Sequence, residues 1–422
     1  MKKLFVLGIG ILISLQGIAQ TNAEILPWST PFTTVNATAF QEQIKTISKA
    51  ASIVGLGEVS HYTKECYQLK ETAIITLMHQ GYDALVLEVD FGQALLWNDF
   101  VVHGKGDLDE LVSTSGWFTY RTEEFKSLLK NIRNFNATSA NKFQVFGMEM
   151  TAMHNNIDWL ISYVSKTPEV SNALLPLLQK ERQIVAFNQY SEEERTDYWN
   201  LYYLLKEFLE IHKTTLINAN GEKDYKIAER ITEITRQFAT YISQDDFGLK
   251  AEFRDQFSAR NIIWVNNLFP EDSKLVLWAH NGHVAKTSPL FNYDVLGSYL
   301  KRWYGDGYVA IGFTFNQGDF GAFANNSFQK ITMAAVTENS ITRTFSNTQA
   351  PFLFFNAREA LKANNATTYF LLNPLKIRTD ISESYSEAQQ KMMSLTISET
   401  YDALIYIDKT SYPTTIPYSQ KK

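Results

Sequence analysis

The chain has 422 residues, a formal net charge of -6 and 45% hydrophobic residues. The chain therefore has no excess of positive charge with which to bind nucleic acid or an anionic membrane surface, so a small-molecule partner fits best. A chain of this size and composition can build a large core without disulfides, and its single cysteine, Cys66, is expected to be a buried thiol.

The N-terminus has the pattern of a signal peptide. Two lysines follow Met1, an apolar run extends from Leu4 to Leu15, and small residues end at Ala19. A helix of this apolar run spans only about 18 Å, against ~30 Å for a bilayer core, so no stable membrane anchor is expected. We predict a signal peptide over residues 1–19, export to the periplasm or the medium, and a single domain over residues 20–422.

Short apolar runs bounded by polar residues or glycine predict buried strands. They lie at residues 51–57, 83–89, 142–147 and 274–279, with two further candidates at 308–315 and 401–407. Between the first two runs, residues 63–80 have apolar side chains at helical spacing, and Gly81 is a typical helix end. Repetition of strand, helix and strand predicts a mostly parallel sheet with helices on its faces.

Residues 155–268 have an almost wholly helical pattern, rich in Leu, Glu, Lys and Tyr. We interpret this segment as a helical insertion between the third and fourth strands that covers the cleft. The predicted fold class is therefore α/β, a three-layer α/β/α arrangement with a mostly parallel central sheet and a helical insertion over the cleft.

Ionisable residues gather where the predicted strands end. Glu58 and His61 follow the first strand, Glu88 and Asp90 close the second, Glu149 closes the third, and His280 and His283 close the fourth. In open α/β sheets the ligand crevice lies outside the carboxyl ends of the strands, so these segments are expected to converge on one site.

The first pair, Glu58 and His61, is three residues apart, and Glu65 follows one helical turn after His61 if the helix begins early. A carboxylate at this spacing can orient an imidazole, fix its tautomer and raise its basicity, as a general base acting on water requires. The alternative is structural: Glu58 would favour a helix dipole and His61 would be merely exposed.

The second group is the loop His280-Asn281-Gly282-His283, in which Gly282 allows a sharp turn. Two imidazoles on such a loop can donate to a developing oxyanion, pass a proton to a leaving alcohol or ligate a metal. The alternative is a tight turn with one satisfied histidine.

Glu88 interrupts an otherwise apolar strand, and a carboxylate there is costly unless a histidine or an arginine pairs with it. Arg254, followed by Asp255 on a predicted helix, offers such a cation, although an ordinary surface charge pair is equally compatible with the spacing. The chain has no Gly-x-Ser-x-Gly elbow, phosphate-binding glycine loop, His-Glu-x-x-His or Cys-x-x-Cys motif. A serine-nucleophile esterase is therefore disfavoured.

These motifs resemble the erythromycin esterase family over most of the mature chain. Gly57-Glu58-Val59-Ser60-His61, with Glu65 after it, is similar to the family's Gly-Glu-Ala-Thr-His followed by a glutamate. Further similar blocks are Gly81-Tyr82 with Leu87-Glu88, Trp117 with Arg121 and Glu124, residues 132–136, Arg254-Asp255 with Asn261, and residues 278–283. Gly147-Met148-Glu149 stands where the family has Gly-x-Asp, which keeps the charge on a longer side chain.

The resemblance implies an esterase in which His61 activates water, Glu58 orients or assists His61, and Glu88, His280 and His283 complete the site. Glu65, Asp90 and Arg254 would support it. The substrate would be a macrolide lactone or a related ester, with no covalent serine intermediate, no metal and no other cofactor. Tyr190, Trp199, Tyr202 and Tyr203 of the helical insertion would wall an apolar pocket or belong to the core.

Two other functions fit the same residues. In a metal-dependent hydrolase, Glu58, His61, His280 and His283 would bind zinc or a similar ion and Glu88 would act as the base. In a non-enzymatic envelope protein, the same cleft would hold a small ligand such as haem or a glycan.

Overall fold

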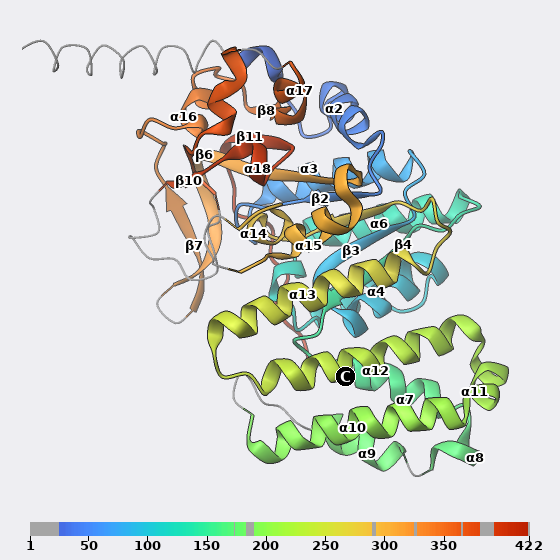
Figure 1. The fold of residues 1–422 in the computed structure, drawn as a ribbon. Coiled ribbons are helices and arrows are strands. Elements are labelled where there is room, and N and C mark those ends of the chain that lie inside the picture. The colour runs from blue at the N-terminus through green and yellow to red at the C-terminus, as the bar shows by residue number, and fades with distance from the viewer. Residues whose placement is uncertain are drawn as a thin grey trace, which may run out of the picture.

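The fold was analysed in a computed structural model that describes residues 25–172, 174–182, 190–288, 293–324, 327–363, 366–379 and 392–420. Within these ranges, nine strands form one sheet in the order β1-β8-β11-β6-β2-β5-β3-β4, with β7 paired to β6 (Figure 1). The strands are β1 Ser29–Phe32, β2 Ile53–Leu56, β3 Ala84–Asp90, β4 Gln144–Glu149, β5 Leu275–Trp278, β6 Tyr308–Ala324, β7 Ser327–Met333, β8 Phe352–Phe355 and β11 Ala403–Thr410. A separate pair consists of β9 Leu375–Ile377 and β10 Met393–Leu395.

The predicted mostly parallel sheet is confirmed. Strands β4, β3, β5, β2, β6 and β11 pair in parallel with their neighbours, and they correspond to the six apolar runs of the sequence. β8 is antiparallel to β1 and β11, and β7 is antiparallel to the outer half of β6. The sequence did not predict β1, β7 and β8, so the antiparallel part of the sheet is new.

The helices lie mainly on the two faces of the sheet and in one region beyond it. They are α2 Thr38–Ser48, α3 Lys64–Met78, α4 Phe91–His103, α5 Leu108–Ser113, α6 Glu123–Thr138, α7 His154–Val164, α8 Pro168–Ser171, α9 Leu175–Arg182, α10 Glu192–Ile211, α11 Lys213–Asn220, α12 Glu222–Ile242, α13 Phe247–Asn266, α14 Asn281–Val284, α15 Leu296–Tyr304, α16 Ile341–Ser346, α17 Ala357–Lys362 and α18 Ile397–Thr400. The helix predicted over residues 63–80 is confirmed as α3, and Gly81 after it has a φ of 80°.

Alternate residues of the central strands point into two different cores, because successive side chains of a strand face opposite sides of the sheet. Ala84 and Val86 of β3 belong to the core that contains residues of α7, α13 and α15, whereas Leu85 and Leu87 belong to the core that contains residues of α2, α3 and α6. Helices therefore cover both faces of the sheet and give the predicted three layers. Cys66 of α3 lies in the second core and is fully buried, as predicted.

The described residues between β4 and β5 contain helices α7 to α13 and no strand. α13 packs beside β4 and α15, α12 packs on α7 and α13, and α10 packs on α12, so this helical region extends away from the sheet (Figure 1). α13 thus connects the region to β4 and α15, and α7 connects it to α4.

The predicted signal peptide, residues 1–19, lies outside the described residues. Among the helices that the structure describes, none is long and apolar enough to cross a membrane.

Candidate active site

Three adjacent strands bring the predicted site residues together. β5 lies between β2 and β3, and in the ladder Trp278 of β5 is opposite both Leu56 of β2 and Leu87 of β3. The residues that follow these three therefore lie near one another at the carboxyl edge. Glu88 comes directly after Leu87, Glu58 and His280 come two residues after Leu56 and Trp278, and each is less than one-tenth exposed.

Glu58 accepts hydrogen bonds on both carboxylate oxygens. Nδ1 of His61 lies 2.7 Å from Oε1, and Oε2 accepts from the ammonium group of Lys70 and, at 3.0 Å, from Nε1 of Trp278. Burial alone disfavours the charged form of this carboxyl, but the charge of Lys70 and the bond with His61 outweigh burial and lower the pKa of Glu58 to about 2. Glu58 is therefore a carboxylate at neutral pH.

His61 is oriented by this carboxylate. An ionised carboxylate only accepts hydrogen bonds, so Nδ1 of His61 carries the proton and Nε2 of the neutral ring is left as the basic nitrogen. The ring of His61 is 4.9 Å from the ring of His280, measured between centroids, and its side chain is 16% exposed. The arrangement thus supplies a partly accessible imidazole with a fixed tautomer.

Lys70 is a site residue that the sequence reasoning missed. Its side chain is completely buried, and its ammonium nitrogen lies 3.9 Å from the centroid of the Trp278 ring. Burial lowers the pKa of Lys70, although the Glu58 carboxylate opposes that shift. The available signal was its position: with Tyr67 and Ile74, Lys70 falls on the buried stripe of α3, where a lysine needs a partner.

Glu88 is the centre of a second group of charges. Its Oε1 accepts from Nη2 of Arg254 at 2.8 Å, and its Oε2 accepts from the backbone N–H of His280 at 2.9 Å. Nε2 of His283 lies 3.4 Å from Oε1. Burial opposes ionisation, but the charges of His283 and Arg254 hold the pKa of Glu88 far below its ordinary range.

Arg254 of α13 joins two strands of the sheet through one guanidinium group. Besides Glu88 on β3, it binds Glu149 at the end of β4, with Nε 3.0 Å from Oε2 and Nη2 2.7 Å from Oε1. The planar fork of arginine suits such a double contact, which the single ammonium of lysine does not reproduce. The predicted pairing of Arg254 with Glu88 is present, and the alternative of a surface charge pair is wrong.

His283 lies between an anion of one helix, Asp255 of α13, and an anion of one strand, Glu88 of β3. Its Nδ1 is 2.7 Å from Oδ1 of Asp255, and its Nε2 faces both Glu88 and, at 3.1 Å, Nη1 of Arg254. Burial lowers the pKa of this imidazole, but Asp255 and Glu88 outweigh burial and the repulsion from Arg254, and raise the pKa of His283 to about 9. His283 is therefore an imidazolium at neutral pH.

Asn281 fixes the loop that carries the two histidines. Its side chain donates to the carbonyl of Phe313 at 2.8 Å and to Thr379, accepts from the N–H of Phe313 at 3.0 Å, and its backbone N–H donates to the carbonyl of Glu58. Gly57 is required beside it, because a Cβ there would lie 2.2 Å from Oδ1 of Asn281. The loop therefore has two histidines and one structural asparagine.

Two predicted supporting residues have other contacts. Asp90 is buried and caps α4 by accepting from the N–H of Gln93 at 2.8 Å, while its second oxygen accepts from Nε1 of Trp117. Burial raises the pKa of Asp90 to about 6. Glu65 accepts hydrogen bonds from the backbone N–H and the hydroxyl of Ser411. The helix α3 begins only at Lys64 and leaves His61 outside, so the expected position of Glu65 one helical turn after His61 is wrong.

The aromatic residues of the helical region pack among themselves. Trp199, Tyr202 and Tyr203 of α10 form ring contacts with one another, and Tyr190 packs edge-on against Phe238 of α12. These described contacts belong to the α10–α12 layer and do not involve the Glu/His cluster. Across the described part of the chain, no group of three or more His, Cys, Asp or Glu side chains has an arrangement that could hold a metal ion.

Sequence comparison relates this site to a known family. Residues 77–410 match the erythromycin esterase family. The chain is 25% identical over 305 residues to erythromycin esterase type II of Escherichia coli, an alignment that covers 63% of this chain and 69% of that protein.

Comparison of structures gives the same fold. A crystal structure of a Bacillus cereus protein has a TM-score of 0.81 at 24% identity and covers 94% of this chain and 99% of its own. A succinoglycan biosynthesis protein has a TM-score of 0.74 at 20% identity, and the match covers 94% of this chain and 98% of that protein. A histidine-to-asparagine mutant of the erythromycin esterase EreC in its open conformation has a TM-score of 0.67 at 16% identity, and the match covers 91% of this chain and 98% of that protein. With the family match extending over most of the chain, this protein belongs to the erythromycin esterase family.

Proposed function

We propose that this member of an esterase family hydrolyses a carboxylic ester or lactone by direct attack of water, with His61 as the general base. The observation that carries the proposal is the contact between Nδ1 of His61 and the Glu58 carboxylate at 2.7 Å. It leaves Nε2 of His61 as the proton acceptor, on a side chain that is partly exposed.

In the proposed reaction, Nε2 of His61 takes a proton from water while the water oxygen bonds to the carbonyl carbon. The carbonyl oxygen becomes an oxyanion, and the ester C–O bond then breaks as the alcohol oxygen takes a proton. Water supplies both the new hydroxyl of the acid and the proton of the alcohol, so no serine ester forms on the enzyme.

The second charge group supplies the complementary chemistry. His283 is an imidazolium at neutral pH because its pKa is raised to about 9, and it is therefore a poor base and a suitable proton or hydrogen-bond donor. Together with Arg254, it provides positive charge for the oxyanion and the leaving alcohol. Glu88 and Glu149 position Arg254 through its guanidinium group. The pKa of His283 thus favours His61 over His283 for the role of base.

For the substrate, we propose a macrolide lactone or a related ester that the protein meets outside the cytoplasm. The relative from Escherichia coli is an erythromycin esterase, and the sequence of residues 1–19 has the pattern of a signal peptide. Export is part of this proposal, and analysis of the N-terminus of the mature protein tests it.

The experiment is hydrolysis in water enriched in ¹⁸O. Erythromycin and a panel of simple lactones and esters are incubated with the protein, and the products are analysed by mass spectrometry. We expect the mass of one water to be added, with a single ¹⁸O in the acid product, and loss of turnover in His61→Ala. His103→Ala, which changes an exposed histidine at the end of α4, is the matched control and should retain turnover. No hydrolysis of any compound, or full activity in His61→Ala, would refute the proposal.

A further inference from the structure

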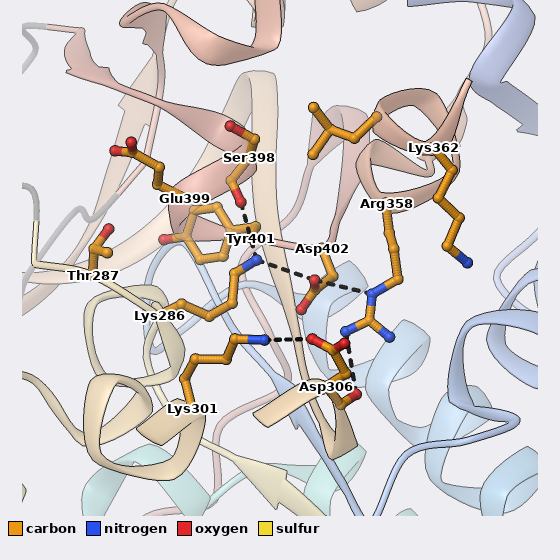
Figure 2. Close-up of a pocket in the computed structure, with 11 residues that line it drawn as sticks. Lys286, Thr287, Lys301, Asp306, Arg358, Lys362, Ser398, Glu399, Tyr401 and Asp402 are labelled. Atoms are coloured by element: carbon orange, nitrogen blue, oxygen red, sulfur yellow. Dashed lines mark hydrogen bonds and ion pairs between the residues drawn. The ribbon is translucent and has the colours of Figure 1, made fainter. Parts of the chain in front are cut away.

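Figure 2 shows a cavity whose lining includes no residue of the Glu/His cluster. Its volume is about 690 Å³, within the range of about 300–1,000 Å³ that is usual for small-molecule sites. Its lining comes from the segment after α14, from α15, α17 and α18, and from the residues just before β6 and β11. The charged residues of the lining are Lys286, Lys301, Arg358, Lys362, Asp306, Glu399 and Asp402.

The strand directions separate this cavity from the candidate active site. Asp306 precedes β6 and Asp402 precedes β11, so both lie at the amino ends of parallel strands. Glu58 follows β2, which is parallel to β6, and therefore lies at the carboxyl end. The two sites are at opposite edges of the same sheet.

The buried wall of the cavity has more positive than negative charge. Oδ1 of Asp402 accepts from both Lys286, at 3.1 Å, and Nε of Arg358, at 3.2 Å, while its Oδ2 accepts from the N–H of Ala310 at 2.8 Å. The side chains of Lys286 and Asp402 are 9% and 7% exposed, and that of Arg358 is 22% exposed. Two cations thus share one carboxylate in a partly desolvated place, in a chain whose overall net charge is -6.

Several N–H donors of this wall remain available. Nη2 of Arg358 makes only long contacts of 3.5 and 3.4 Å with the carbonyls of Asp306 and Tyr308, and no described residue accepts from Nη1. Lys286 uses two of its three N–H bonds, on Asp402 and on the carbonyl of Ser398 at 3.1 Å. Figure 2 shows Lys286 and Arg358 reaching Asp402 from different elements, with Lys301 paired to Asp306 beside them.

We propose that this cavity is a binding site for a small anionic solute whose carboxylate or phosphate group is held by Arg358 and Lys286. The guanidinium fork matches the two oxygens of such a group, and the ammonium adds a point charge. Lys301 and Lys362 also line the cavity, paired with Asp306 and Glu359, and add positive charge that attracts anions. The proposal concerns a site apart from the ester-hydrolysing one and does not rest on the function proposed for it.

Isothermal titration calorimetry of the full chain with inorganic phosphate, citrate and acetate tests the proposal, with glycerol as the neutral control. We expect saturable binding of phosphate or citrate and none of glycerol, and the relative affinities for phosphate and acetate identify the preferred anionic group. Arg358→Gln should weaken binding about tenfold or more, because a charge-assisted double contact is lost. Arg236→Gln is the matched control, since Arg236 is similarly exposed at 25% and binds Glu233 on α12.

His61→Ala distinguishes the two sites, and it should bind the anion as the unchanged protein does. Loss of anion binding in His61→Ala, no effect of Arg358→Gln, or no saturable binding of any of the three anions overturns the proposal. If Arg358→Gln does not fold, the double variant Lys301→Gln/Lys362→Gln takes its place. Its control is the double variant Lys180→Gln/Lys226→Gln, which changes two exposed, ion-paired lysines of the helical region. Equal affinities of these two double variants would also overturn the proposal.

Discussion

Glu58 and Lys70 form an ion pair that is closed to solvent, with side chains 4% and 0% exposed. The pair connects α3 to the end of β2 beneath His61. Because two buried charges compensate each other here, removal of one leaves the other without a partner, which costs about 3–5 kcal/mol in comparable buried pairs. The same ion pair helps to keep Glu58 ionised and so acts on the orientation of His61.

We therefore expect Glu58→Gln to lower both the free energy of unfolding and kcat. The double variant Glu58→Gln/Lys70→Met should regain much of the stability, because no buried charge is left, but it should not regain kcat. Urea denaturation and steady-state kinetics of the three proteins measure the two effects separately. A double variant that recovers kcat along with stability would show that Glu58 has only a structural role.

The pH dependence of stability should depend on His283. The folded-state pKa of His283 is raised to about 9 from an ordinary value of 6.5, so its protonated form stabilises the fold. This contribution is complete below pH 6.5 and is lost as the pH rises through about 9. In Asp255→Asn, the main anionic partner is gone, so the folded-state pKa of His283 should fall, and the loss of stability should be smaller and be complete at a lower pH.

Unfolding free energies of the unchanged protein and of Asp255→Asn, measured by urea denaturation from pH 6 to above pH 9, test this expectation. The two curves should converge as the pH rises, because both proteins then have a neutral His283. Curves that stay parallel over this range would contradict the expected charge on His283.

Much of the sheet and of the site was predictable from local patterns. The strands that form β2, β3, β4 and β5 are continuous apolar runs, and the ionisable residues after them lie together because the carboxyl ends of parallel strands share one edge. The sequence did not contain the strand order, in which β5 separates β2 from β3. That order explains why His280 comes between Glu58 and Glu88.

The remaining features depend on contacts distant in sequence. β1 and β8 are four-residue strands in which apolar and polar residues do not alternate. Only the pairing of β1 with β8, and of β8 with β11, defines them. Glu65 has the spacing of a partner for His61, yet its carboxylate binds Ser411 near the other end of the chain. The position of Lys70 on the apolar stripe of α3 indicates that it needs a partner, but only the structure shows that this partner is Glu58.

Gly57 tests whether the turn after β2 tolerates any side chain. A Cβ there would lie 2.2 Å from Oδ1 of Asn281 and 3.0 Å from the carbonyl of Ile311, so Gly57→Ala must displace the loop of the two histidines. We expect a loss of about 1–3 kcal/mol in stability, as for other overpacked sites, and a fall in kcat. Thermal unfolding and kinetics measure both.

Gly116→Ala is the control for this substitution, because a Cβ at Gly116 has no atom within 4 Å and Gly116 lacks a positive φ. It should leave stability and kcat nearly unchanged. Equal behaviour of the two alanine variants would mean that the close approach of Gly57 to Asn281 is relieved without consequence for the site.

Arg254 offers the sharpest test of the second charge group. Lysine at this position keeps the charge but supplies one ammonium nitrogen, which cannot replace the guanidinium contacts with Glu88 on β3 and Glu149 on β4. A lost hydrogen bond to a charged group costs about 1.5–3 kcal/mol, so Arg254→Lys should lower kcat/KM about 10- to 100-fold. Arg236→Lys, which alters an equally bidentate arginine bound to Glu233 on α12, should change kcat/KM little. Near-ultraviolet circular dichroism of both variants controls for folding. If both variants are folded and have the same kcat/KM, the position of the Arg254 guanidinium between the two strands has no part in the reaction.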